Sequence, residues 1–227
     1  MYIKEIYKKM SEKQKILNIK TPCLMLFSAK RNSGKSHSIT WLLYRLCRRF
    51  QHILVMSSTA FNGHYAQYLP KECIFPNFDE DKINQLFERQ KKILSEKKNK
   101  PENILLILDD VVSQTTFKSS VFQRIACEGR HYLITVFITS QHWCKIPPII
   151  RVNCDYIAIL GPQTKTVQQM IFDEFGMNNY EKINDFMQRL KLCTEKYGIF
   201  VIDNLTMTDH GIRAPEKLPK FKIKSKQ

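Results

Sequence analysis

The feature that most constrains the fold of this chain is a short polar turn, Ser33-Gly34-Lys35-Ser36, between two apolar segments. The segment before it, residues 22–29, is an apolar run of the kind that forms a strand buried on both faces. In residues 35–50, apolar side chains recur at helical spacing, and arginines gather at the end, where cations stabilise a helix C-terminus. A G-K-S triplet that follows a strand and opens a helix is the arrangement that binds phosphate groups, so the sequence predicts a phosphate loop.

Strand-like and helical segments alternate along the rest of the chain. Apolar, strand-like runs lie at residues 52–57, 103–110, 133–139, 155–160 and 198–203. Helical patterns begin at the acidic residues 79–81, after a cap at Thr115 or Thr116, and near residues 165–175 and 179–193. Strands separated by helices of this length require crossover connections, which predicts an α/β fold with a mostly parallel central sheet flanked by helices.

Positive charge is concentrated in three segments. The 227 residues carry a net charge of +15, and residues 1–20, 89–100 and 211–227 together hold 14 of these charges. We expect a P-loop domain over residues 21–210, a basic N-terminal extension over residues 1–20 and a basic, flexible C-terminal tail over residues 211–227. Three basic segments on a nearly neutral body favour a polyanionic partner, although the sign of the charge does not distinguish DNA from RNA or a membrane surface.

Several other classes of protein are disfavoured. The longest apolar runs, such as residues 104–108, are far shorter than the roughly 20 residues of a membrane helix. The N-terminal residues lack the apolar stretch of a signal peptide, and the seven cysteines form no C-x-x-C pair, which argues against a zinc ribbon or a disulfide framework. We therefore expect a protein of a reducing compartment that has no membrane span and is not secreted.

The phosphate loop supplies the first set of candidate residues. Backbone N–H groups of the loop and of the helix N-terminus can converge on an anion, Lys35 adds a positive charge, and the Ser36 hydroxyl can bind Mg²⁺. The full motif begins with glycine where this chain has Ala29, and alanine is tolerated there if the backbone keeps a negative φ. We predict a nucleotide-binding segment formed by Ala29, Lys30, Arg31, Asn32, Ser33, Gly34, Lys35, Ser36 and His37.

Two carboxylates end the most strongly apolar run of the sequence, residues 103–110. Asp109 and Asp110 are thereby placed at the carboxyl end of a buried strand, where open α/β sheets bind ligands. Asp109 is the candidate Mg²⁺ ligand, in the manner of a Walker B residue. Asp110 is the candidate for orienting or deprotonating a water molecule, a place that most ATPases of this type give to glutamate.

Three polar residues near the next strand are further candidates. Gln141 follows the run 133–139, and its amide can hydrogen-bond both a γ-phosphate and an attacking water molecule. Arg130 precedes the same run and could be an arginine finger that reaches the nucleotide of a neighbouring subunit, because a guanidinium can meet two phosphate oxygens at once. Arg151 is the other candidate finger, and either arginine could instead form an ordinary ion pair.

These motifs together resemble a known family. The stretches AKRNSGKSHSI, ILLILDDV and GRHYLITVFITSQHWCKIPPIIRVNCDYIAIL resemble the DNA-packaging ATPases of large DNA viruses, virophages and related elements, the poxvirus-type branch of the FtsK–HerA superfamily. The resemblance spans about residues 22–203. Its most specific element is R-H, a strand, S-Q and then P-x-x-I-R-x-N, and the doubled aspartate is also similar to this branch.

The resemblance implies a fold, a function and partners. It implies an additional-strand, RecA/FtsK–HerA-like P-loop core that forms a ring and uses ATP hydrolysis to move double-stranded DNA into a capsid. It implies that Lys35 and Ser36 bind nucleotide and Mg²⁺, that Asp109 holds the metal and Asp110 activates water, and that Gln141 senses the γ-phosphate while Arg130 is the finger in trans. The implied partners are DNA, further copies of the chain and a capsid or portal vertex, and the implied location is the host cytoplasm, a viral factory or the virion.

Two other functions fit part of this evidence. A small P-loop nucleotide kinase has a similar size, but it should show a lid with paired arginines, and no such lid is recognisable in the sequence. A DNA-binding adaptor with a vestigial phosphate loop would not need Lys35, Ser36, Asp109 and Asp110 together. Nucleotide turnover stimulated by DNA, as opposed to turnover stimulated by nucleoside monophosphates, separates these possibilities.

Overall fold

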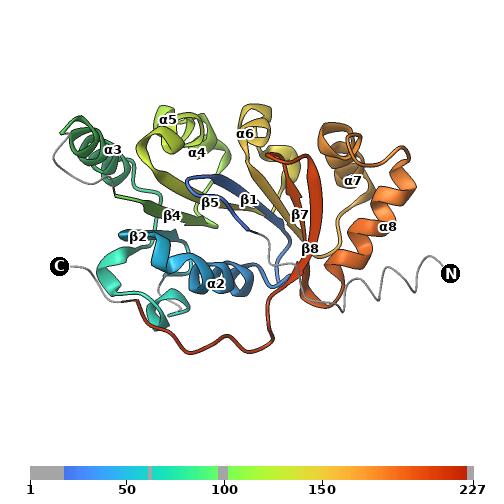
Figure 1. Cartoon of the computed structure of the whole chain (residues 1–227), viewed down its shortest axis with the longest axis horizontal. Coiled ribbons are helices and arrows are strands. Elements are labelled where there is room, and N and C mark those ends of the chain that lie inside the picture. Colours follow the sequence, from blue (N-terminus) through green and yellow to red (C-terminus); the bar gives the residue numbers. More distant parts are fainter. Residues whose placement is uncertain (1–17, 61–62, 97–101, 224–227) are drawn as a thin grey trace.

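The fold is built around one eight-stranded sheet, seen in a computed structural model that describes residues 18–60, 63–96 and 102–223. The strand order is β3-β2-β4-β5-β1-β6-β7-β8 (Figure 1). The strands are β1 (Leu24–Ala29), β2 (His52–Ser57), β3 (Ile74–Phe75), β4 (Ile104–Asp109), β5 (Ile134–Ser140), β6 (Tyr156–Leu160), β7 (Gly198–Asp203) and β8 (Thr208–Arg213). Strands β1 to β6 run parallel, whereas β7 is antiparallel to both of its neighbours. The predicted mostly parallel sheet is confirmed, and β5 between β1 and β4 is the additional strand that the resemblance implies.

Helices cover both faces of the sheet. One face packs against α3 (Glu80–Ser95), α5 (Ser120–Glu128), α6 (Pro148–Asn153), α7 (Lys165–Ile171) and α8 (Ile183–Thr194). The other face packs against α2 (Lys35–Leu46), which Figure 1 shows on the side of the sheet away from α3 to α7. Since side chains alternate along a strand, Leu24 and Leu26 of β1 enter the first core and Met25 and Phe27 the second. The strands are therefore buried on both faces, as their continuous apolar runs predict.

Some elements differ from the sequence-based expectation. The helix expected after a cap at Thr115 or Thr116 is two helices, α4 (Gln114–Lys118) and α5, which are capped by the side chains of Ser113 and Ser119. Each serine accepts a hydrogen bond from the backbone N–H three residues later, so the cap falls earlier than the apolar pattern suggests. Strands β3 and β8 and helix α6 have no strong sequence signal and were not expected.

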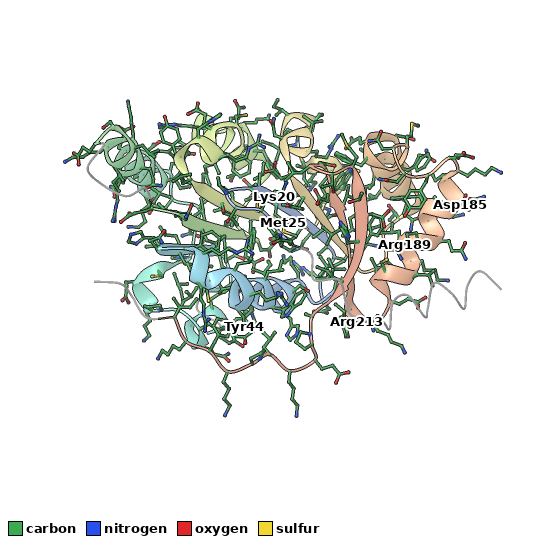
Figure 2. All side chains as sticks on the ribbon, viewed as in Figure 1. Lys20, Met25, Tyr44, Asp185, Arg189 and Arg213 are labelled. Carbon is green, nitrogen blue, oxygen red and sulfur yellow. The ribbon has the colours of Figure 1, made fainter. Side chains whose placement is uncertain are left out.

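The C-terminal segment packs against the domain as far as Ile223. Residues 208–213 form β8 beside β7, so the expected domain boundary at residue 210 falls inside a strand. The chain then passes beneath α2 (Figure 1). The Phe221 ring stacks on the Tyr68 ring, with centroids 4.7 Å apart, and its centroid lies 5.2 Å from that of Tyr44, which Figure 2 labels. Ile223 N donates a hydrogen bond of 2.8 Å to the carbonyl of Tyr68. Within the segment 211–227, which is expected to be a flexible tail, the side chains of Phe221 and Ile223 thus have partners on the domain.

Several sequence-based expectations concern residues beyond this description. Most of the basic segment 1–20, the lysines at positions 97, 98 and 100 and residues 224–227 lie outside the described residues. Within the described ranges, no helix has the length and apolar character needed to cross a membrane. All seven cysteines are free thiols, and Cys23, Cys154 and Cys193 are buried.

Candidate active site

The phosphate loop connects β1 to α2 at the carboxyl edge of the sheet. Gly34 caps α2 with φ +81° and ψ 14°, a left-handed conformation that favours glycine. The Ser33 hydroxyl donates a hydrogen bond of 2.7 Å to the carbonyl of Lys30, which closes the loop on itself. Ala29 ends β1 in extended backbone, a conformation that alanine adopts without strain. The N-terminus of the 12-residue helix α2 thus faces the same place as the loop, which is a ready site for an anion.

Asp109 lies directly against the first residues of α2. The Ser36 hydroxyl is 3.3 Å from Asp109 Oδ2, and Lys35 Nζ is 3.5 Å from Asp109 Oδ1. The Asp109 side chain is buried, with 2% of its surface exposed. A hydroxyl and a carboxylate oxygen are the hard ligands that Mg²⁺ prefers, so Ser36 and Asp109 fit the metal that the sequence implies. Among the described residues, no group of three or more His, Cys, Asp or Glu side chains could hold a metal ion by itself.

Two hydroxyl groups that the sequence did not indicate hold Asp109 in place. Tyr65 donates a hydrogen bond of 2.8 Å to Asp109 Oδ2, and Thr139 donates one of 3.0 Å to Asp109 Oδ1. Tyr65 is completely buried, and this burial, together with the adjacent Asp109 carboxylate, holds the pKa of its phenol well above the ordinary value. Tyr65 therefore remains a proton donor, and both oxygens of Asp109 have fixed hydrogen-bond partners.

Asp110 also approaches Lys35, but unlike Asp109 it faces solvent. Its backbone has φ +60°, an unusual conformation for a residue with a side chain, and its N–H donates to the Thr139 hydroxyl at 2.9 Å. The Asp110 carboxylate accepts a hydrogen bond of 2.7 Å from the Gln141 amide and lies 3.9 Å from Lys35 Nζ. Its side chain is 41% exposed. One aspartate is thus enclosed beside Ser36, and the next is presented to water next to Gln141.

Other residues of the predicted nucleotide-binding segment surround the loop. Lys30, Arg31 and Asn32 are exposed, and Asn32 has φ +59°. His37 Nε2 lies 2.7 Å from the carbonyl of Pro215, to which it can donate a hydrogen bond. The His37 side chain therefore contacts the C-terminal segment.

Arg130 does not join this group of residues. It precedes β5 and therefore lies at the amino edge of the sheet, opposite the phosphate loop. Its guanidinium donates a hydrogen bond of 2.7 Å to Asp155 Oδ1, while Asp155 Oδ2 accepts one from the backbone N–H of Leu24. The Arg130 side chain is still 42% exposed. At the opposite edge, it cannot reach the phosphate loop of its own chain.

Arg151, the other candidate finger, is a buried structural residue. Its guanidinium forms a two-pronged ion pair with Glu174 and donates to the carbonyl of Ile146. It also lies over the Trp143 ring, 5.6 Å from the centroid. Only 7% of its side chain is exposed, and three of the five N–H donors of its guanidinium are bound to Glu174 and Ile146 within the domain.

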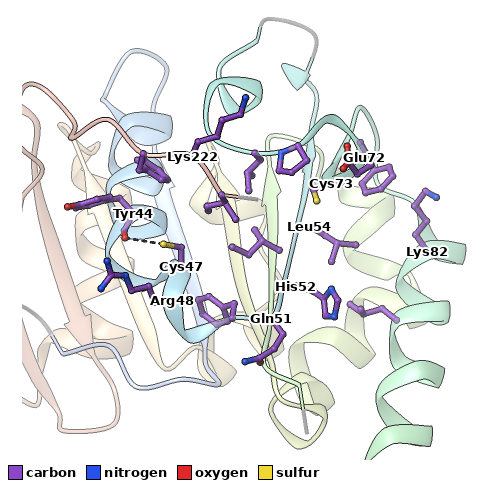
Figure 3. A pocket seen from close by; sticks show the side chains of 18 of the residues that line it. Tyr44, Cys47, Arg48, Gln51, His52, Leu54, Glu72, Cys73, Lys82 and Lys222 are labelled. Carbon is purple, nitrogen blue, oxygen red and sulfur yellow. Dashed lines mark hydrogen bonds between the residues drawn. The ribbon is translucent and has the colours of Figure 1, made fainter. Parts of the chain in front are cut away.

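A cavity of about 1240 Å³ lies elsewhere, between α2 and α3 (Figure 3). Arg48, His52, Leu54, Glu72 and Lys82 are among the residues that line it. They come from the amino half of β2, from the short helices on either side of it and from α3. The lining includes none of the residues of the phosphate loop. The cavity is therefore separate from the site of Lys35, Asp109 and Asp110.

Known proteins with similar sequences come from large DNA viruses. The chain is 28% identical over 195 residues to protein L437 of Acanthamoeba polyphaga mimivirus, covering 80% of this chain and 66% of that protein. It is 27% identical over 183 residues to protein 075L of Invertebrate iridescent virus 6, covering 80% of this chain and 70% of that protein. The chain thus spans about two thirds of the length of these relatives.

Solved structures share the fold at low sequence identity. The genome packaging NTPase B204 of Sulfolobus turreted icosahedral virus 2, in complex with AMPPCP, superposes with a TM-score of 0.61 at 16% identity. That match covers 86% of this chain and 98% of B204. The pCW3 conjugation coupling protein TcpA superposes with a TM-score of 0.54 at 15% identity, over 85% of this chain and 60% of TcpA. Both likenesses concern the architecture of the sheet and its helices.

The match to a protein family extends over nearly the whole chain. Residues 9–215 correspond to the family described as poxvirus A32 protein. This range contains the phosphate loop, both aspartates, Gln141 and the antiparallel pair β7–β8. The chain belongs to the poxvirus A32 protein family.

Proposed function

We propose that this protein is a Mg²⁺-dependent ATPase that drives the packaging of double-stranded DNA into a viral capsid. The observation that carries the proposal is the convergence of Lys35, Ser36, Asp109, Asp110 and Gln141 at one edge of the sheet. Membership in the A32 family supports the same reading, as does the fold shared with a genome packaging NTPase. The polar groups of the site are those that phosphoryl transfer to water requires.

Each residue of the site has a distinct role in this proposal. Bound Mg²⁺, held by Ser36 and Asp109, would neutralise charge on the β- and γ-phosphate oxygens. Lys35 and the N–H groups of the loop bind the phosphates, and Tyr65 and Thr139 keep the Asp109 carboxylate aligned. Asp110 accepts the proton of the attacking water or orients that water, and the Gln141 amide links Asp110 to the position of the γ-phosphate.

Arg130 is proposed to act on the nucleotide of a neighbouring subunit in a ring. From the amino edge of the sheet, Arg130 cannot contact a nucleotide bound to its own chain. Its partial exposure leaves the guanidinium accessible to a second copy. The Asp155 carboxylate holds the side chain in this position. In the same proposal, DNA is held by phosphate contacts from exposed lysines, a capsid or portal vertex receives the ring, and the protein works in the host cytoplasm or viral factory.

The test of the function compares ATP turnover with and without double-stranded DNA, and with nucleoside monophosphates. We expect DNA to stimulate turnover and monophosphates to have no effect, and Lys35→Ala to lose nucleotide binding. Stimulation by a monophosphate with transfer of phosphate to it would identify a kinase instead. ATP binding without turnover under any of these conditions would identify a DNA-binding adaptor.

A mixing experiment tests the role of Arg130. Arg130→Ala should bind ATP normally, and its turnover rate should fall by a factor of about 10³–10⁵, which is the contribution of transition-state arginines in related NTPases. Mixing it with Lys35→Ala should restore part of the activity, because one subunit supplies the arginine and its neighbour the intact phosphate loop. Thermal unfolding of the variant is the control for the loss of the Asp155 ion pair. The absence of rescue in verified mixed oligomers would make Arg130 a purely structural residue.

A further inference from the structure

The phosphate loop has two flanks, and the aspartates occupy only one of them. In the strand order, β4 and β5 lie on one side of β1, and they carry Asp109, Asp110 and Gln141. Strands β6 and β7 lie on the other side of β1. In the proposed ATPase, the reacting phosphate lies beside Asp110. The nucleoside must then extend away from these carboxylates, toward the ends of β6 and β7.

The antiparallel direction of β7 brings a loop to this second flank. Ala29 pairs with Leu160, and Leu160 pairs with Ile199, so the carboxyl ends of β1 and β6 meet the amino end of β7. The turn that precedes β7, residues 195–197, therefore lies at the same edge as the phosphate loop. A crossover strand running parallel to β6 would have placed this turn at the opposite edge.

Tyr197 is the residue of this turn that touches the loop. A Cβ atom added to Gly34 would lie 3.2 Å from Tyr197 Cδ1, so the tyrosine ring sits against the glycine that caps α2. The end of β6 is equally close, since a Cβ atom on Gly161 would lie 3.1 Å from the Ser33 side chain. The ring is thus next to the predicted phosphate site, within the reach of one nucleotide.

The ring is also exposed, at a turn whose backbone has an unusual conformation. Tyr197 is 68% exposed, and its backbone has φ +60°, with φ +49° at Lys196. Gly198 allows the turn to lie close to the end of α8, because a Cβ atom there would lie 2.0 Å from the carbonyl oxygen of Cys193. The exposed face of the ring is therefore available to a ligand bound at the phosphate loop.

We propose that the Tyr197 ring is the stacking platform for the base of the bound nucleotide. This inference rests on the proposed ATPase function and adds the nucleobase subsite to it. Stacking on an aromatic ring suits every base, because each base has a π-face. Tyr197 therefore adds affinity for a nucleoside triphosphate over inorganic triphosphate, with little discrimination between adenine and guanine.

Binding measurements on the full chain test the proposal, with ATP and inorganic tripolyphosphate as the two probes. Tyr197→Ala should weaken ATP binding by about 5- to 150-fold, the range measured when a stacking ring is removed. Tripolyphosphate affinity should stay the same, since it has no base, and Tyr197→Phe should behave like the wild type. The ratio of the two affinities is the readout that a merely structural role of Tyr197 would not change.

The results that would contradict the nucleobase subsite can be told apart from those that would contradict the ATPase proposal. Equal weakening of both ligands by Tyr197→Ala would mean a distorted phosphate loop, and no weakening would mean that the base lies elsewhere. Either result overturns the nucleobase subsite while leaving the ATPase function standing. Wild-type protein that binds neither ligand, like Lys35→Ala, would overturn both.

Discussion

On the β4–β5 side of the phosphate loop, a hydrogen-bond network joins the polar residues: Gln141 donates to Asp110, and the Thr139 hydroxyl links Asp109 to the Asp110 backbone. On the β6–β7 side, by contrast, Tyr197 stands exposed beside Gly34 and Gly198. In the proposed ATPase, the first side holds charges in fixed positions, because charge develops where the phosphate is transferred. The second side needs only to contact an unreactive part of the ligand. Under the proposed function, the difference means that the hydrogen-bonded side carries out the reaction and the exposed ring holds the unreactive part of the nucleotide.

Among the variants that test this comparison, Asp110→Asn should have the largest effect on ATP turnover. We expect turnover to fall by about 10²–10⁴, the usual contribution of a general base, while ATP affinity changes little. The asparagine keeps the size of the side chain and a partner for Gln141, so the fold should be preserved. Single-turnover hydrolysis and a separate binding titration measure the two quantities, and near-normal turnover would remove Asp110 from the mechanism.

Tyr65→Phe should have an intermediate effect on the same side of the loop. The substitution removes the donor to Asp109 Oδ2 and leaves the ring in place, and a hydrogen bond to a charged group contributes about 1.5–3 kcal/mol. With one restraint lost, Asp109 can turn toward Lys35, so we expect turnover to fall about tenfold and the half-saturating Mg²⁺ concentration to rise.

Tyr68→Phe is the matched control for this change, because Tyr68 contacts Phe221 through its ring instead of Asp109. ATP affinity measured without Mg²⁺ should be the same in both variants. Tyr65 and Tyr68 begin and cap a short 3-10 helix, Tyr65–Gln67. A rise in the Mg²⁺ requirement of Tyr68→Phe equal to that of Tyr65→Phe would mean that this helix, and not the Tyr65 hydroxyl, positions Asp109.

The smallest effect on turnover should come from the lysines of the C-terminal segment. Pro215 of this segment touches His37, but Lys217, Lys220 and Lys222 are exposed. Replacing the three lysines with glutamine keeps Phe221 and Ile223 packed on the domain. We expect ATP turnover without DNA to be unchanged and the slope of log affinity for duplex DNA against log salt to flatten by two to three units, at roughly 0.9 per contact.

An equal number of lysines on the far side of the molecule provides the control. Lys165, Lys182 and Lys191 are exposed on and beside α7 and α8, and their replacement removes the same charge. If both triple variants flatten the slope equally, the C-terminal segment makes no particular contact with DNA. Binding would then depend on the overall charge of the protein.

The sequence by itself determined the reactive side of the site. Asp109 and Gln141 each follow an apolar strand, and the phosphate loop follows another. Because all parallel strands of a sheet end at one edge, their local positions were enough to predict that these residues meet. The hydrogen bond between Gln141 and Asp110 and the contacts of Ser36 and Lys35 with Asp109 agree with that reasoning.

Only the tertiary structure decided the rest. The resemblance favours Arg130 over Arg151 as the finger, but only the structure shows that Arg151 is buried in an ion pair with Glu174 while Arg130 stays partly exposed. Tyr65 reaches Asp109 from 44 residues away, and Tyr197 reaches Gly34 only because β7 runs antiparallel. Periodicity and turn motifs report the conformation of neighbouring residues, whereas these contacts depend on how distant segments pack, which no local pattern contains.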